Sequence, residues 1–166
     1  MGVRRLGPSD RAALKAARLR SLQDAPEAFG SSYERELAFP DSVWAGRLAA
    51  PANVQFAWED GDGAVVGIAT FVHDGDDPRI GYLVGMWVDA SVRGTGAADR
   101  LIDAVRDAAR TAGVTILRLH VADGNGRAER VYERHGFWRT GRAVTRPRDR
   151  VREYEMETSL GRAVRG

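Results

Sequence analysis

Apolar residues alternate with polar ones, or run together, along seven short stretches of the chain, which is the pattern of buried or half-buried β-strands. These stretches cover residues 3–6, 54–58, 64–72, 80–88, 115–121, 137–144 and 151–158. Acidic, glycine-containing segments at 59–63 and 74–78 separate the second, third and fourth stretches, and their composition predicts hairpin turns. We therefore expect these three strands to form an antiparallel meander.

Apolar residues recur at helical spacing in the segments between the strands. The first helix begins near Ser9 and Asp10, either of which can cap it because a short oxygen side chain accepts free amide protons of the first turn. The segment 27–39 is irregular or short-helical, another short helix starts at 40–42, and longer helices are expected over 96–112 and 125–134. Gly113 ends the first of these longer helices. The order of elements predicts an α/β (α+β) fold in which helices flank a mixed sheet.

Length and composition favour one soluble domain over residues 1–166, of which 43% are hydrophobic and 29% charged. The chain has no cysteine, so disulfides, thiolate metal sites and cysteine nucleophiles are excluded. It shows neither an apolar signal core nor a run approaching the ~18 apolar residues of a membrane span, so we expect a cytoplasmic protein with no membrane contact. Lys15 is the one lysine among 25 basic residues, and the net charge is only +2, so the abundance of arginine does not indicate nucleic-acid binding.

A glycine-containing loop follows the strand at 80–88 and opens the helix at 96–112. Gly94 and Gly96 leave room for backbone amides to approach a pyrophosphate, and the helix N-terminus and Arg93 add positive charge. The loop lacks the third glycine of a dinucleotide-binding fingerprint and the Gly-Lys-Ser/Thr of a P-loop. Taken alone, such a loop is more often a turn whose glycines only satisfy backbone geometry.

A second motif occurs about thirty residues later, and the two together resemble the GNAT superfamily of N-acetyltransferases. The family's cofactor signature is Arg or Gln, two residues, Gly, one residue, then Gly or Ala, and here it is met by Arg93, Gly96 and Ala98. Its later motif places Ala three residues after Asn, Tyr four residues after that Ala, and then Gly-Phe. The matching residues are Asn125, Ala128, Tyr132, Gly136 and Phe137.

A family Leu-x-Val segment also has a counterpart before the loop, in Met86, Trp87 and Val88. The departures are small: Met86 replaces the usual leucine, and Ala90 stands where the family often has proline. The resemblance is close over residues 80–140 and implies a twisted sheet of about seven strands.

The resemblance implies acetyl-CoA as co-substrate, no metal, and an assignment for each motif residue. Backbone amides of Met86 and Val88 would hold the pantetheine arm, and the Met86 N–H would act as an oxyanion donor. The loop would cradle the pyrophosphate, and Asn125 would hydrogen-bond the cofactor arm. The residues so assigned to acetyl-CoA are Met86, Trp87, Val88, Arg93, Gly94, Thr95, Gly96, Ala97, Ala98 and Asn125.

Tyr132 is the catalytic residue that the resemblance implies, because it would face the sulfur of the thioester. Coenzyme A leaves as a thiolate when an amine attacks, and a phenol with a pKa of about 10 can protonate it. The alternative for Tyr132 is a half-buried helix tyrosine that packs on the sheet. With no cysteine and no Ser-His motif, direct transfer without an acyl-enzyme is expected.

The sequence says less about which residues bind the acceptor amine. In the family the segment around residue 30 shapes the acceptor pocket, so Phe29, Tyr33 and Glu34 are candidates to contact the amine, with Glu36 as a second carboxylate. Each is also compatible with packing or with a solvated helix face. The acceptor is a small-molecule or peptide amine whose identity stays open, and a homodimer also stays open. His120 is a further candidate, as a proton relay near the sulfur.

Two other functions compete with the enzyme hypothesis. A relative of the fold could bind acyl-CoA as a sensor without turnover, although the presence of Tyr132 argues against it. Alternatively, the Arg146–Arg152 turn, with its four arginines, could bind nucleic acid or an acidic partner. No aromatic stacking pattern accompanies these arginines, so we interpret the turn as a solvated hairpin tip and do not expect nucleic acid as a partner.

Overall fold

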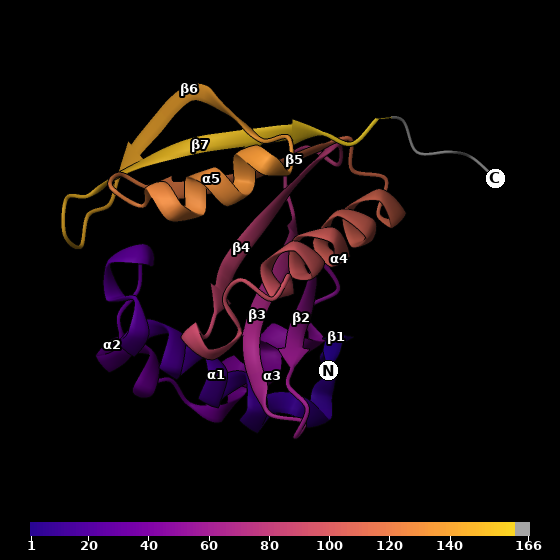
Figure 1. Ribbon diagram of the computed structural model, residues 1–166, viewed down its shortest axis with the longest axis vertical. Helices are drawn as coiled ribbons and strands as arrows, with labels where there is room; N and C mark the ends of the chain where they lie inside the picture. The colour runs from indigo at the N-terminus through magenta and orange to yellow at the C-terminus, as the bar shows by residue number, and fades with distance from the viewer. Residues whose placement is uncertain (162–166) are drawn as a thin grey trace.

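Within residues 1–161, which the computed structural model describes, seven strands form one twisted sheet in the order β1-β2-β3-β4-β5-β7-β6 (Figure 1). Neighbouring strands are antiparallel except for β4 and β5, which are parallel. The mixed sheet flanked by helices confirms the expected fold class. The strands are β1 (Gly2–Arg5), β2 (Asn53–Glu59), β3 (Val65–His73), β4 (Ile80–Val88), β5 (Ile116–Ala122), β6 (Trp138–Thr145) and β7 (Arg152–Ser159).

Helices cover both faces of the sheet. On one face, α4 (Ala97–Thr111) and α5 (Gly126–Arg134) pack on the main core, where Leu101, Val105 and Tyr132 meet strand residues such as Leu119 and Met156. On the other face lie α1 (Arg11–Asp24), α2 (Tyr33–Leu37) and α3 (Asp41–Ala49). In the described part of the chain, three short 3₁₀ segments complete the fold: η1 (Pro8–Asp10), η2 (Pro26–Ala28) and η3 (Ala90–Val92).

The predicted elements are confirmed to within a residue or two at their ends, but the predicted cap of the first helix is wrong. Neither Ser9 nor Asp10 caps α1 with its side chain, because η1 precedes that helix. The Asp10 carboxylate instead accepts the Gly7 N–H at 2.7 Å and pairs with the Arg4 guanidinium at 3.0 Å. Gly113 ends α4 in the left-handed conformation, as expected.

The sheet divides where β4 leaves β5. In the described chain the two strands share only three residue pairs, from Ile80–Ile116 to Tyr82–Arg118. Further along β4, the pairing with β3 slips from Ile68–Trp87 to Thr70–Val84, and Gly85 takes a φ of +63°. This bulge bends β4 away from its neighbour, and Figure 1 shows β4 running from β5 toward α1. The backbone edge of β4 beyond Tyr82 is therefore left for another partner.

Candidate active site

A cleft of about 910 Å³ lies where β4 and β5 separate. One wall is the end of β4, and the opposite wall is α5 together with the loop that precedes it. The glycine loop closes one end, and the segment from Asp24 to Phe29 closes the other. Residues from the two predicted motifs, far apart in the sequence, thus face the same space.

The glycine loop owes its shape to backbone conformation. Gly94 and Gly96 have φ values of +78° and +89°, a region that side chains other than hydrogen disfavour. Gly96 is the residue before the first turn of α4, whose unpaired N–H groups carry partial positive charge. Together with Ala98, these glycines line the cleft, whereas the Thr95 hydroxyl donates to the Val92 carbonyl and the Ala97 side chain is buried in the core.

Arg93 connects the glycine loop with α1 and β4. Its guanidinium pairs with Asp24 at 2.8 Å and donates through Nε to the Val88 carbonyl at 3.1 Å. Asp24 also accepts the indole N–H of Trp87 at 2.9 Å. Arg93 lines the cleft, but Asp24 neutralises part of its charge, and this ion pair joins the loop to the end of α1.

Asn125 lies in the cleft wall at the start of α5, where its Oδ1 accepts the Ala128 N–H at 3.4 Å. This hydrogen bond caps the helix and leaves the amide nitrogen of the side chain for another partner. The sequence interpretation missed Arg127 and Arg130, two further cations in the same wall. Their positions in the first turns of α5 were visible in the sequence, but only the fold shows that they face the cleft.

Asp99 joins the first turn of α4 to the end of α5. Its carboxylate lies 2.7 Å from His135 Nε2 and 2.8 Å from the Arg134 guanidinium. The hydrogen bond with His135, and then Arg134, lower the pKa of Asp99. These contacts join α4 to α5, and Arg134 offsets the negative charge of Asp99 beside the glycine loop.

Tyr132 projects from α5 into the core side of the cleft. Only 8% of the residue is exposed, and its ring packs edge-on against Phe137 at 5.9 Å. Burial raises the pKa of Tyr132 well above that of a free phenol. The hydroxyl therefore stays protonated to a higher pH than a free phenol does.

The structure brings only one of the three predicted acceptor residues to the cleft. Phe29 lines it, and the Arg18 guanidinium lies 4.7 Å from the centre of the Phe29 ring. Tyr33 and Glu34 lie outside the cleft at the start of α2, and Glu34 is exposed. Glu36 is buried instead: burial favours a higher pKa, but hydrogen bonds and charge from Arg18, with help from Ser31 and Arg47, lower it.

His120, on β5, is also not among the residues that line the cleft. Its ring stacks on Tyr82 at 6.2 Å, and its Nε2 is 3.9 Å from a carboxylate oxygen of Glu155. In the described part of the chain, no three histidine or carboxylate side chains gather as metal ligands. Nor does any helix over these residues have the length and apolarity to cross a membrane.

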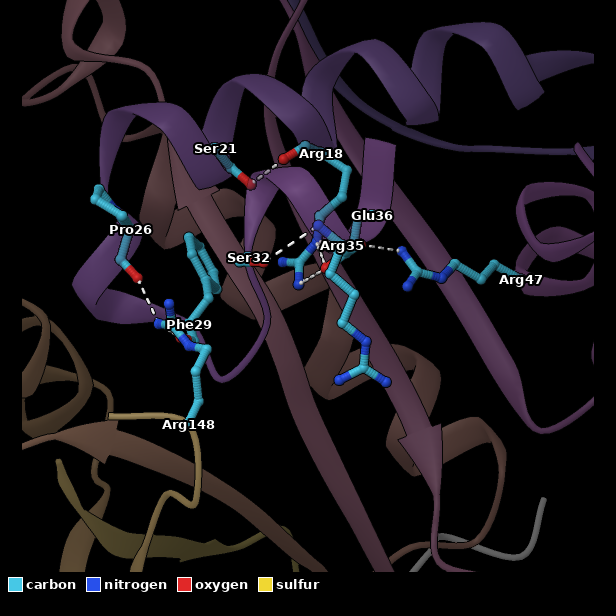
Figure 2. A network of polar contacts seen from close by, with 9 residues as sticks. All are labelled: Arg18, Ser21, Pro26, Phe29, Ser32, Arg35, Glu36, Arg47 and Arg148. Atoms are coloured by element: carbon cyan, nitrogen blue, oxygen red, sulfur yellow. Dashed lines mark hydrogen bonds and ion pairs between the residues drawn. The ribbon is translucent and has the colours of Figure 1, made fainter. Parts of the chain in front are cut away.

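The arginine turn between β6 and β7 is docked rather than solvated, which corrects the predicted hairpin tip. Arg146 is only 3% exposed, and it donates to the Glu27 carbonyl at 2.8 Å and pairs with Asp149 at 2.8 Å. Arg148 donates to the carbonyls of Pro26 and Phe29 at 3.0 and 2.8 Å (Figure 2). Two of the four arginines thus bind backbone carbonyls of the η2 region, so this turn packs on the segment that closes one end of the cleft and is not a free basic surface.

Comparison with known proteins adds an independent finding. Residues 17–137 match the model of the acetyltransferase (GNAT) family. A GNAT-family acetyltransferase from Streptococcus pneumoniae superposes with a TM-score of 0.79 at 19% identity, covering 96% of this chain and 98% of that one. A spermidine N-acetyltransferase from Vibrio cholerae, solved with CoA and spermine, gives 0.76 at 18% identity, with 97% and 96% covered.

A GCN5-related N-acetyltransferase from Kribbella flavida gives a TM-score of 0.74 at 22% identity, covering 95% of this chain and 96% of that one. At these identities the likeness of each structure concerns the fold. A comparison with curated protein sequences gives no match.

Proposed function

The chain belongs to the GNAT acetyltransferase family, and from this premise we propose that it transfers an acetyl group from acetyl-CoA to a primary amine by direct attack. The observation that carries the proposal is the cleft between β4 and β5. It combines an unpaired strand edge, a helix N-terminus behind two left-handed glycines, and one buried, protonated phenol.

The residues present fit an acyl-CoA. The edge of β4 that β5 leaves unpaired, at Met86 and Val88, would take the amide-containing pantetheine arm as an added strand. The N-terminus of α4 would take the pyrophosphate, with Arg127 and Arg130 supplying charge from the opposite wall. Bound there, acetyl-CoA supplies an acetyl group activated as a thioester.

The chain's own groups then have defined tasks. The amine nitrogen forms a bond to the acetyl carbon, and the Met86 N–H stabilises the negative charge that develops on the carbonyl oxygen. As the carbon–sulfur bond breaks, the Tyr132 hydroxyl gives its proton to the departing thiolate. The attacking nitrogen loses its extra proton to solvent, and Tyr132 is reprotonated from solvent, so no covalent enzyme intermediate is needed.

Calorimetric titration with acetyl-CoA, with NAD and ATP as controls, tests the cofactor half of the proposal. We expect micromolar binding of acetyl-CoA and no heat from either control, because only acyl-CoA carries an arm for the β4 edge. Thiol release in the presence of amines then tests transfer. Binding without thiol release from any amine would favour the sensor function, and no binding would refute the enzyme proposal.

A further inference from the structure

We propose that the acceptor is a small amine that also carries a carboxylate, held by Arg18 and Arg47 in a recess beside the cleft. The inference rests on the proposed acetyl transfer, because it names the acceptor for the same site. It is carried by the position of the recess, by its charge, and by the way its two arginines are fixed.

The recess has a volume of about 270 Å³ and lies on the face of the sheet that α1 and α3 cover. Its wall includes Gly85, and the next residue, Met86, lines the cleft, so the two hollows reach β4 at consecutive residues of its bulge. Arg18 Nη1 lies 3.8 Å from the point where a Cβ on Gly85 would sit. An anion bound to Arg18 would therefore hold an attached amine near Met86.

The two guanidiniums share one counter-ion. Arg18 donates to the buried Glu36 through Nε at 3.1 Å and Nη2 at 2.9 Å, and Arg47 donates through Nη1 at 2.9 Å (Figure 2). The lowered pKa of Glu36 keeps this carboxylate ionised. Two cations against one anion leave a net positive charge at the recess, whose lining among the described residues contains no carboxylate.

The arginines also have donors to spare. Within residues 1–161, Arg18 Nη1 and Arg47 Nη2 have no hydrogen-bond partner. Aromatic rings hold both groups in place: the Arg18 guanidinium lies 4.7 Å from the centre of the Phe29 ring, and that of Arg47 lies 4.7 Å from a Trp44 ring. Pre-oriented guanidinium N–H groups suit a carboxylate, and their charge opposes a polycation such as spermidine.

The floor of the recess limits the size of the acceptor. Thr70 donates to Gln55 at 2.7 Å, and the Gln55 amide donates to the Ala69 carbonyl at 3.2 Å, so both polar side chains are fixed. Val84, 41% exposed, offers an apolar contact. The volume falls below the ~300–1,000 Å³ of pockets for drug-sized ligands, which suits a molecule about the size of an amino acid.

The test compares L-amino acids with their carboxamides and with spermidine in the thiol-release assay. We expect at least one amino acid to have a kcat/KM about ten-fold or more above that of its amide, and spermidine to be a poor acceptor. Arg47→Gln should raise KM for that amino acid about ten-fold but leave KM for its amide and for acetyl-CoA unchanged. Arg47→Lys should restore part of the preference, and Arg35→Gln, on the exposed side of α2, should change none of these values.

Three results would overturn the inference. The first is equal or faster acetylation of amides or spermidine, and the second is a rise in KM that Arg47→Gln causes equally for amino acid and amide, which would mark a purely structural arginine. The third is binding of acetyl-CoA with no acetylation of any amino acid, which removes this acceptor class while the cofactor site stands. Failure of acetyl-CoA to bind is a different outcome, since it removes the proposed function and with it this inference.

Discussion

At the scale of single residues, the environment of Tyr132 suits both packing and the proton transfer that we propose for it. The ring packs on Phe137 in the main core, and the same burial raises the pKa of the hydroxyl. Packing and catalysis were alternatives when only the sequence was considered. In the fold the two do not exclude each other, because the ring packs in the core and the same residue lines the cleft.

Replacing Tyr132 with phenylalanine should lower kcat about 100-fold, because a positioned general acid typically contributes ~10²–10⁴-fold. The affinity for acetyl-CoA should stay within about two-fold, because the ring and its contact with Phe137 remain. Because burial raises the pKa of Tyr132, the phenol stays protonated as the pH rises. The wild-type kcat should therefore show no loss from Tyr132 ionisation up to about pH 10. Steady-state rates and calorimetry of both proteins measure this, and an unchanged kcat would exclude Tyr132 as the acid.

At the scale of elements, the two ends of α4 allow a test of whether the glycine loop binds a ligand or is only a turn. Gly96 precedes a helix of 15 residues and has a φ of +89°, and Gly113, just beyond the other end, has a φ of +81°. Neither glycine would bring an added Cβ within 4 Å of another group. The two positions therefore share the same backbone strain and differ in location, since only Gly96 lines the cleft.

Gly96→Ala and Gly113→Ala form a matched pair. Each should lose about 1–2 kcal/mol of stability, because a non-glycine residue is strained in the left-handed region. Only Gly96→Ala should weaken acetyl-CoA binding, by about ten-fold or more, because relief of that strain moves the amides that face the cleft. Denaturant unfolding and calorimetric titration of both variants supply the two values. Equal affinity in the two would mean that the loop does not hold the cofactor.

Contacts between distant elements could not be predicted from the sequence. Local signals predicted the strands and helices, because hydrophobic period and glycine act over a few residues, and the resemblance to a known family identified the two motifs. The pairing of Arg146 with the Glu27 carbonyl spans 119 positions, and Glu36 meets Arg18 and Arg47 from three different helices. No local pattern encodes such contacts, so the docked hairpin and the recess became visible only in the fold.

At the scale of the whole molecule, the sheet consists of two parts joined by few contacts near the cleft. The ladder between β4 and β5 has only three pairs among the described residues, and the docking of Arg146 and Arg148 on the η2 region supplies a second connection. A ligand seated in the cleft would contact β4 from one part and α5 from the other. Binding should therefore stabilise the fold as a unit and not only a local loop.

Acetyl-CoA at about 100 times its dissociation constant should stabilise the folded state by about 2.7 kcal/mol, because a ligand that binds only the native protein shifts the unfolding equilibrium by mass action. For a chain of this length each kcal/mol corresponds to roughly 2–4 °C, so the melting temperature should rise by about 5–10 °C. Thermal unfolding with acetyl-CoA, with NAD as the control, measures the shift, and Gly96→Ala should show a smaller one at the same concentration. A single transition that moves as a whole is expected, because the cleft residues come from both parts of the sheet. A second transition that acetyl-CoA leaves in place would show instead that the two parts unfold separately and that the ligand holds only one of them.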